Sequence, residues 1–152
     1  MSRVFLFISC LFSLINICNS ARENTGYNMG VVNKNITDID ELLDKGKYKQ
    51  SIELLKKKIK NNKLNPDLHN YLGYAYRKNG DLEIAILSYK EALRLNPKHT
   101  RAHNYIGMAY LKLGNIDKAR FHLEKLAQLC EERCKEYKTL KKLFYETFNN
   151  EN

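Results

Sequence analysis

The sequence predicts an all-α fold of stacked helical hairpins, and three observations support this. Glycines recur 34 residues apart, as Gly46, Gly80 and Gly114 at one position and as Gly73 and Gly107 at another. A fixed period of this length is typical of helical repeat arrays. Residues that favour helices dominate, and only two prolines interrupt the chain. No stretch alternates apolar and polar residues as a half-buried strand would.

The chain is long enough, at 152 residues, for one small domain with its own core. Its formal net charge is +9, and much of the excess lies in lysine runs such as 56–58 and 141–142. The simplest interpretation of this lysine-rich surface is that it is exposed to solvent and promotes solubility. It also suits an anionic membrane surface or an acidic polypeptide.

Residues 1–20 have the composition of a secretory signal peptide. Arg3 supplies a positive charge, Val4 to Ile17 is nearly all apolar or small, and small residues precede Ala21. The apolar run is short for a membrane span, so an uncleaved anchor is the less favoured alternative. We therefore expect an exported protein, periplasmic or extracellular, that meets little nucleic acid.

Residues 21–36 lack a helical period and contain much Asn and Gly, so we expect a flexible lead-in. A degenerate first hairpin is predicted over 37–63, with Thr37 as the N-cap of its first helix. That helix is expected to end at Gly46. The apolar stripes of this hairpin consist of Ile39, Leu42, Leu43, Tyr48, Ile52, Leu55 and Ile59.

The second hairpin is predicted over 64–97. Asn65 caps its first helix and Pro66 tolerates the first helical position, since its missing N–H is unpaired there anyway. Gly80 ends this helix because the turn needs a left-handed backbone, and Asp81 is expected to cap the partner helix. The buried stripes consist of Leu68, Tyr71, Leu72, Ala75, Tyr76, Ala85, Tyr89, Ala92 and Leu93.

The third hairpin copies this pattern over 98–131, with Asn115 as the cap of its second helix. Gly73 and Gly107 are expected to let the two helices of each hairpin approach closely. The buried stripes consist of Ala102, Tyr105, Ile106, Ala109, Tyr110, Ala119, Leu123 and Leu126.

One amphipathic helix over 132–148 is expected to close the array, and residues 149–152 are expected to fray. Its apolar face consists of Tyr137, Leu140, Phe144 and Phe148, and lysines take the other face. A stacked array exposes the apolar side of its last repeat, and such a helix covers it.

These positions resemble the tetratricopeptide repeat. The matching residues are Leu72, Gly73, Tyr76, Gly80, Ala85, Tyr89, Ala92 and Pro97 in the second hairpin and Ile106, Gly107, Tyr110, Gly114 and Ala119 in the third. Leu123, Leu126 and Glu131 depart from the pattern. The resemblance implies a right-handed α-solenoid of three hairpins plus a C-terminal capping helix. The spacing of Cys130 and Cys134 before the last helix is similar to that in small exported bacterial proteins of this family.

Cys130 and Cys134 are the two cysteines that remain if the leader is removed. One helical turn places their α-carbons about 6 Å apart, which a disulfide tolerates. In an oxidising compartment we expect a structural disulfide that tightens the turn before the last helix. Free thiols, or a redox or metal role, are the alternatives.

The sequence offers no support for catalysis. It has no nucleophile elbow, no phosphate-binding loop and no His-Glu-x-x-His motif. His69 and His103 occupy equivalent positions and are interpreted as packing residues, because too few further ligands accompany them for a metal. Only His122 lies near the cysteines in sequence. We expect no enzymatic activity, no cofactor and no metal.

The candidate binding site is the concave face that such repeats line with the first helix of each hairpin. Its residues follow the spacing i, i+3, i+7, i+10 opposite the core. They are Asp67, Asn70, Tyr74, Arg77 and Lys78 in the second hairpin and Arg101, Asn104, Met108, Leu111 and Lys112 in the third. Asparagine amides suit an extended peptide backbone, exposed tyrosine, methionine and leucine offer apolar contact, and the cations favour an acidic segment.

The family's Lys/Asn/Arg clamp for chaperone C-termini is not reproduced. Ile36 and Asp40 stand where its first Lys and Asn belong, and Tyr71 and Tyr105 where a further Asn and Arg belong. That specificity is therefore not carried over to this chain.

The sequence therefore predicts an exported, non-enzymatic scaffold that binds a segment of another envelope protein in its concave groove. Self-association through the end helix or the incompletely capped first repeat is the alternative, and a cysteine-dependent redox helper is a weaker one. The identity of the partner does not follow from the sequence.

Overall fold

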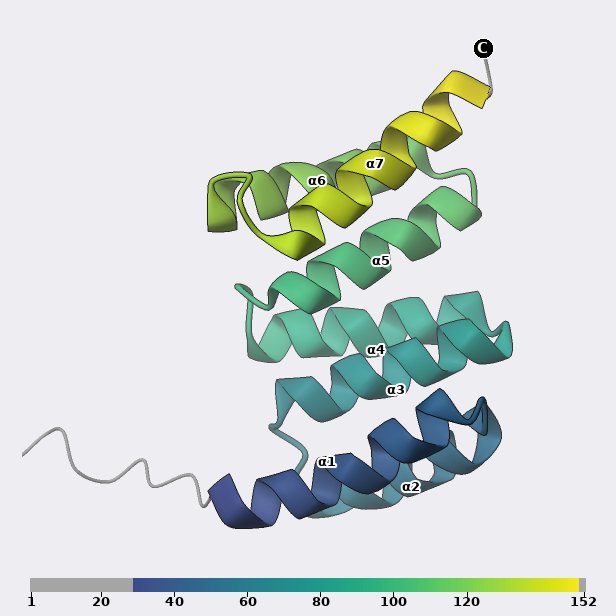
Figure 1. The fold of residues 1–152 in the computed structure, drawn as a ribbon, viewed down its shortest axis with the longest axis vertical. Helices are drawn as coiled ribbons and strands as arrows, with labels where there is room; N and C mark the ends of the chain where they lie inside the picture. Colours follow the sequence, from purple (N-terminus) through teal and green to yellow (C-terminus); the bar gives the residue numbers. More distant parts are fainter. Residues whose placement is uncertain (1–28, 151–152) are drawn as a thin grey trace, which may run out of the picture. The chain divides into compact units, whose positions relative to one another are not determined.

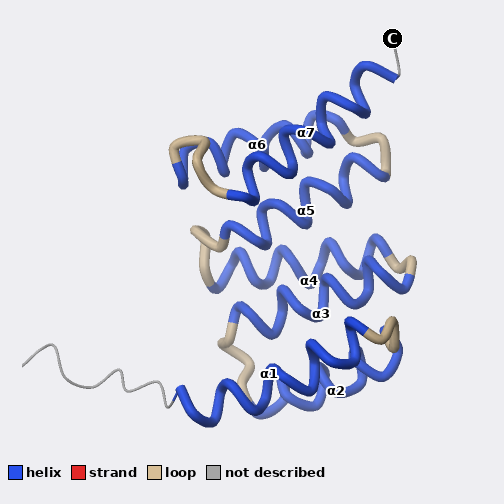
Figure 2. The backbone as a smooth tube through the Cα atoms, in the orientation of Figure 1, coloured by secondary structure: helices blue, strands red, loops and turns tan. Residues whose placement is uncertain are grey.

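The computed structural model describes residues 29–150, and all of its regular structure is helical (Figures 1 and 2). The helices are α1 (Met29–Asp44), α2 (Tyr48–Asn61), α3 (Pro66–Asn79), α4 (Leu82–Leu95), α5 (Thr100–Lys112), α6 (Ile116–Cys130) and α7 (Lys135–Asn150). This confirms the all-α prediction. The predicted signal peptide and residues 21–28 of the predicted lead-in lie outside the described residues. No described helix is both long and apolar enough to cross a membrane.

Successive helices pack on one another as hairpins. A boundary between two compact units falls between Asp38 and Ile39, and α2 to α7 all belong to the second unit. Within it α2 packs on α3, α3 on α4, α4 on α5 and α5 on α6, while α7 packs on both α5 and α6. Direct contacts also join α3 to α5 and α5 to α7, so these three helices form one layer. In Figure 1, α3 lies in front of α4 and α7 in front of α6.

Each hairpin turns at a glycine with a left-handed backbone, as the sequence predicts. The φ angles are +67° at Gly46, +101° at Gly80 and +69° at Gly114. The residue after each glycine donates its N–H to the carbonyl five residues earlier, at 2.8–2.9 Å. This bond satisfies a carbonyl that the end of the helix would otherwise leave unpaired. The same turn therefore recurs every 34 residues.

The helix starts are only partly as predicted. The side chains of Asn65 and Asn115 do accept hydrogen bonds from the first turns of α3 and α6. Asp81 forms no such cap, because its carboxylate instead accepts a bond from Asn79 Nδ2 at 2.6 Å. An unpredicted cap occurs at His99, whose Nδ1 accepts from the N–H of Ala102 at 3.2 Å.

Two terminal boundaries also differ from the prediction. Helix α1 begins at Met29, so Thr37 lies inside the helix and is not its N-cap. No proline or further glycine interrupts the chain between Gly30 and Asp44, and the helix therefore continues through the segment predicted as a lead-in. Helix α7 continues to Asn150, two residues beyond its predicted end.

Two glycines in the first helices make room for bulky side chains, but with different partners. A Cβ at Gly73 would lie 2.6 Å from the Tyr89 ring on α4, which confirms the close approach within that hairpin. A Cβ at Gly107 would lie 2.5 Å from Leu140 of α7, so the prediction that Gly107 contacts its own hairpin partner is wrong. The third hairpin has Leu123 at the position of Tyr89, and the capping helix fills this place instead.

The capping helix buries most of its apolar face. Tyr137, Leu140 and Phe144 are buried and belong to the core that runs through α2 to α7. Phe148, predicted on the same face, is 41% exposed, because it lies one turn beyond the part of α7 that the array covers. The capping prediction is confirmed for the first three turns.

A disulfide between Cys130 and Cys134 joins the end of α6 to the start of α7, with α-carbons 5.6 Å apart. The turn that it closes contains Glu131 and Glu132, both with positive φ angles of 48° and 62°. Such backbone angles are unfavourable for residues with a Cβ, and the disulfide holds the turn in which they occur. The predicted pairing is present.

We predict that Gly73→Ala lowers the free energy of unfolding by about 1–3 kcal/mol, because the new methyl group overlaps the Tyr89 ring. Chemical denaturation followed by circular dichroism measures this change. In a double-mutant cycle with Tyr89→Leu the double variant should lose less than the sum of the two single changes. Strictly additive losses would show that this contact does not set the helix separation.

Candidate functional site

The layer formed by α3, α5 and α7 carries two hollow regions. The first, here called the tyrosine pocket, has a volume of about 230 Å³. It is lined by Asp40, Leu43, Asp44, Asn70, Tyr71, Tyr74, Arg101 and Tyr105. The second, here called the α5–α7 groove, consists of two hollows of about 610 and 400 Å³ that share Met108 and Leu143. Its other lining residues are Arg77, Leu111, Lys112, Arg133, Lys135, Lys138, Thr139, Lys142, Glu146 and Thr147.

An arginine links the two regions. The ring centroids of Tyr74 and Tyr105 are 5.4 Å apart, and the Arg77 guanidinium lies 5.2 and 5.4 Å from them. A guanidinium is attracted to the negative face of an aromatic ring, so these contacts hold Arg77 in place. Its Nε is buried and has no hydrogen-bond partner among the described residues. Arg77 therefore lines the α5–α7 groove while its guanidinium lies over two rings of the tyrosine pocket.

A second arginine is held by an ion pair between adjacent hairpins. Arg101 on α5 donates to Asp67 on α3 at 2.8 Å, and its guanidinium lies 5.8 Å from the Tyr71 ring. His99 donates to the same carboxylate at 3.2 Å through Nε2, since its Nδ1 already accepts from the backbone. The bond from His99 and the charge of Arg101 lower the pKa of the Asp67 carboxyl, although partial burial opposes this. Asp67 thus remains ionised and neutralises Arg101.

The structure alters the predicted set of groove residues. Asp67, Tyr74, Arg77, Arg101 and Met108 are partly exposed, and Lys78 and Lys112 are exposed. Three others are buried, contrary to the prediction: Asn70 is 1% exposed, Asn104 6% and Leu111 5%. Asn70 still lines the tyrosine pocket and Leu111 the α5–α7 groove, although little of either side chain is exposed, whereas Asn104 lines neither region. The buried Oδ1 atoms of both asparagines have no hydrogen-bond partner within the described part of the chain.

Sequence reasoning missed the contributions of α1 and α7. Asp40 and Asp44 of α1 line the tyrosine pocket, and Leu143 of α7 lines both hollows of the groove. The sequence does contain a signal for α7, because its lysines alternate with apolar residues on a helical period. The same pattern predicts a capping helix, and α7 additionally forms one side of the α5–α7 groove.

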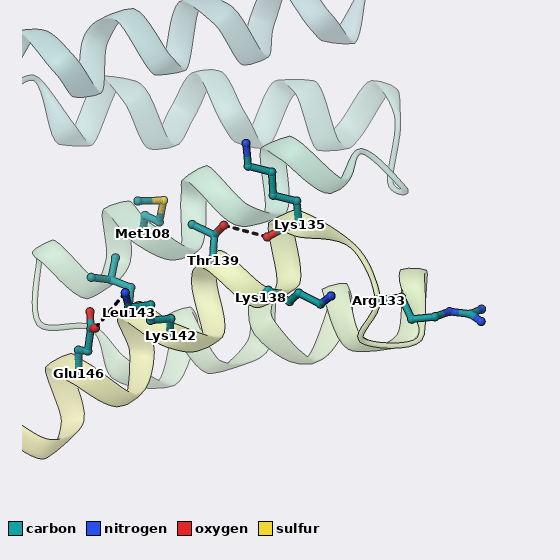
Figure 3. A pocket seen from close by; sticks show the side chains of 8 residues that line it. All are labelled: Met108, Arg133, Lys135, Lys138, Thr139, Lys142, Leu143 and Glu146. Carbon is teal, nitrogen blue, oxygen red and sulfur yellow. Dashed lines mark hydrogen bonds and ion pairs between the residues drawn. The ribbon is translucent and has the colours of Figure 1, made fainter.

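The α5–α7 groove combines an apolar floor with a cationic rim. Figure 3 shows Met108 of α5 and Leu143 of α7 lying next to each other, with Lys142 and Glu146 near them. Lys142 Nζ and Glu146 Oε1 are 3.8 Å apart, which is a weak exposed ion pair. Lys135, Lys138 and Arg133 complete the rim, and the Arg133 side chain extends away from the floor in Figure 3. This arrangement suits a ligand that carries both an apolar group and negative charge.

The histidines serve packing. His69 Nε2 bonds to the Lys63 carbonyl at 2.9 Å, and His103 Nε2 bonds to the Pro97 carbonyl at 3.0 Å. Both bonds span six residues and tie a first helix to the loop before it. His103 also contacts His122 of α6, with their Nδ1 atoms 2.9 Å apart.

The histidine pair holds its protons in a defined arrangement. Because His103 donates through Nε2, its Nδ1 accepts in the neutral form, and His122 donates through Nδ1. Burial, followed by the nearby charges of His103 and Lys90, lowers the pKa of His122 to about 4. Burial is also the main cause that lowers the pKa of His103, and Lys125 and His99 add to it. No cluster of three or more potential metal ligands occurs among the described residues.

Comparisons with known proteins agree on one kind of repeat. Three family models for the tetratricopeptide repeat match residues 39–87, 73–114 and 100–133. Together they cover residues 39–133. A comparison with curated proteins returns no match.

Solved structures of helical repeat domains have the same fold. PcrH in complex with the chaperone-binding region of PopD has a TM-score of 0.71 at 13% identity, over 84% of this chain and 98% of that one. The Yersinia enterocolitica type III secretion chaperone SycD in complex with a peptide of the translocator YopD has a TM-score of 0.68 at 16% identity. The match covers 80% of this chain and 92% of that one. The second TPR domain of human RPAP3 in complex with the HSP70 peptide SGPTIEEVD has a TM-score of 0.66 at 23% identity. The match covers 73% of this chain and 92% of that one. At these identities the likeness shows the fold alone.

We predict that the histidine pair makes the protein less stable in mild acid. Both histidines have a lower pKa folded than unfolded, so the unfolded chain binds more protons below pH 6.5. The free energy of unfolding should therefore fall by about 2–3 kcal/mol as the pH drops from 7 to 4, beyond the contribution of the carboxyl groups. Denaturation curves at a series of pH values measure this.

The variant His122→Gln should flatten this pH dependence. His69→Gln is the matched control, since His69 forms the equivalent carbonyl bond without a second histidine opposite. An equal slope in the His122 variant and the unaltered protein would show that the pair does not couple stability to pH.

Proposed function

Because the chain belongs to the tetratricopeptide repeat family, we propose that it is a non-catalytic module that binds a segment of another protein. The bound segment lies along the layer of α3, α5 and α7. We propose further that the protein is exported and that its partner is another protein of the cell envelope. The composition of residues 1–20 supports the export.

The α5–α7 groove is the observation that carries this proposal. It is open along its length, and its floor of Met108 and Leu143 remains partly exposed although both residues pack against the core. Methionine adapts its shape to different apolar groups, so this floor accommodates side chains of several kinds. An open apolar floor on an otherwise charged face is typical of an interaction site.

The rim of the groove indicates an acidic segment. Lys112, Lys135, Lys138 and Lys142 line it, together with Arg77 and Arg133. Among the described residues, Glu146 is the one acidic side chain that lines the same hollows. A segment with one or two apolar residues between acidic ones therefore complements the groove in both shape and charge. RPAP3 and SycD, which share the fold, are complexed with peptides of other proteins.

Selection from a displayed peptide library tests this proposal. We expect the selected peptides to combine acidic and large apolar residues and to bind less tightly at higher salt, because exposed charge pairs are screened. Met108→Asp should weaken such a peptide at least about tenfold, measured by fluorescence anisotropy, because it places a charge in the apolar floor.

The control is Leu87→Asp, which alters an exposed apolar residue on α4, outside the groove. Circular dichroism of both variants establishes that the helices persist. Equal effects of the two changes, or selected peptides with no acidic residue, would contradict the proposed site.

Self-association through α7 is the second candidate. Tyr145 is 52% exposed and Phe148 41%, so the last turns of α7 present apolar surface that the array leaves open. If this surface pairs two copies, sedimentation equilibrium should give an average mass that rises with concentration, and Tyr145→Ser should abolish the rise. A constant monomer mass would reject this candidate.

A further inference from the structure

The tyrosine pocket differs in charge from the rest of the protein. Asp40 and Asp44 stand one turn apart on α1 and both line it. Among the described residues, neither carboxylate forms an ion pair, although Asp40 hydrogen-bonds to Tyr71 and helps to raise the pKa of that phenol. The chain has a net charge of +9, so two carboxylates without a cationic partner make this pocket locally negative on a basic protein.

Arg101, the one cationic side chain among the described residues that line the pocket, does not neutralise the charge of these carboxylates. Arg101 is already paired with Asp67 at 2.8 Å, and it stacks near the Tyr71 ring. Arg77 lies over the rings of Tyr74 and Tyr105 and lines the neighbouring groove, not this pocket. The pocket therefore retains a net negative charge from α1.

The walls of the pocket favour a positively charged donor. Three tyrosines line it, and because Arg101 and Arg77 already lie over their rings, the attraction for a further cation comes from the two carboxylates. Asn70 also lines it, and its buried Oδ1 has no hydrogen-bond partner among the described residues. An acceptor left unpaired in the interior is unfavourable, so a donor that enters the pocket and reaches Asn70 regains a hydrogen bond.

We propose that the tyrosine pocket is a subsite for the side chain of a lysine or arginine in the bound segment. The inference rests on the proposed function, because it takes the layer of α3, α5 and α7 to be the binding face. The cation lies beside the Asp40 and Asp44 carboxylates and donates toward Asn70. A carboxylate in the same place would be repelled by both aspartates and would find Arg101 already paired.

This subsite also orients the segment. The tyrosine pocket is the acidic end of the layer, and the α5–α7 groove is the basic end. A segment that carries its basic residue at one end and its acidic residues at the other matches both ends in only one direction. Charge order therefore selects the direction of binding.

The test uses three capped peptides, Ac-Ala-Ala-X-Ala-Ala-NH2, in which X is Arg, Gln or Glu. NMR spectra of the whole protein are recorded during titration with each peptide. We expect the Arg peptide to shift the ring signals of Tyr71 and Tyr105 and the side-chain amide of Asn70, and the Gln and Glu peptides to leave them unchanged. Equal shifts with the Arg and Gln peptides, or no shifts with Arg, would overturn the proposal.

Variants of the two aspartates test whether their negative charge binds the Arg peptide. The double variant Asp40→Asn and Asp44→Asn should weaken the Arg peptide about tenfold, because it removes both charges and keeps the side-chain size. Glu41→Gln is the matched control, since Glu41 lies on the same helix, pairs with Lys45 and does not line the pocket. An unchanged affinity in the double variant would also overturn the proposal.

The two proposals fail separately. If library peptides still depend on Met108 while the Arg peptide leaves the tyrosine pocket unchanged, the cation subsite is wrong and the binding face stands. If the Arg peptide binds the pocket while Met108→Asp has no effect on library peptides, the subsite stands and the groove is wrong.

Discussion

Each hairpin of this protein reverses direction at a glycine whose positive φ is unfavourable for residues with a Cβ. Because the same backbone turn recurs at Gly46, Gly80 and Gly114, each second helix returns along its first helix in the same way. Successive first helices can then lie side by side, which places α3, α5 and α7 in one layer. The α5–α7 groove lies in this layer, and the tyrosine pocket lies where the layer meets α1, so the candidate site depends on the repeated turn.

The third hairpin departs from the second at one position with large consequences. Tyr89 fills the space over Gly73, whereas Leu123 at the equivalent position leaves the space over Gly107 to Leu140 of α7. The capping helix is thereby held against α5 as well as α6. Since α7 contacts α5, its Leu143 and its lysines become part of the binding layer. A helix that closes the core thus also forms a wall of the groove.

Charge is distributed unevenly over this layer. The tyrosine pocket carries two aspartates without a cationic partner among the described residues, and the α5–α7 groove carries most of the lysines and arginines that line the two regions. Between them, Arg77 is held on Tyr74 and Tyr105, and Arg101 is held on Asp67. These fixed arginines are internal contacts rather than free ligands, and the remaining exposed charges decide which segments fit.

The sequence by itself determined the helical class, the glycine turns, most of the core and the cysteine pair. These features depend on local backbone preference and on periodic burial. Both can be recognised directly from the 34-residue repeat in the sequence. The tertiary structure alone decided which inner-face residues stay open. Asn70, Asn104 and Leu111 have the right spacing for the groove, yet little of their side chains is exposed, and Asn104 lines neither hollow region. Asp40, Asp44 and Leu143 enter the site through packing between helices distant in sequence, and the spacing within one repeat carries no information about such contacts.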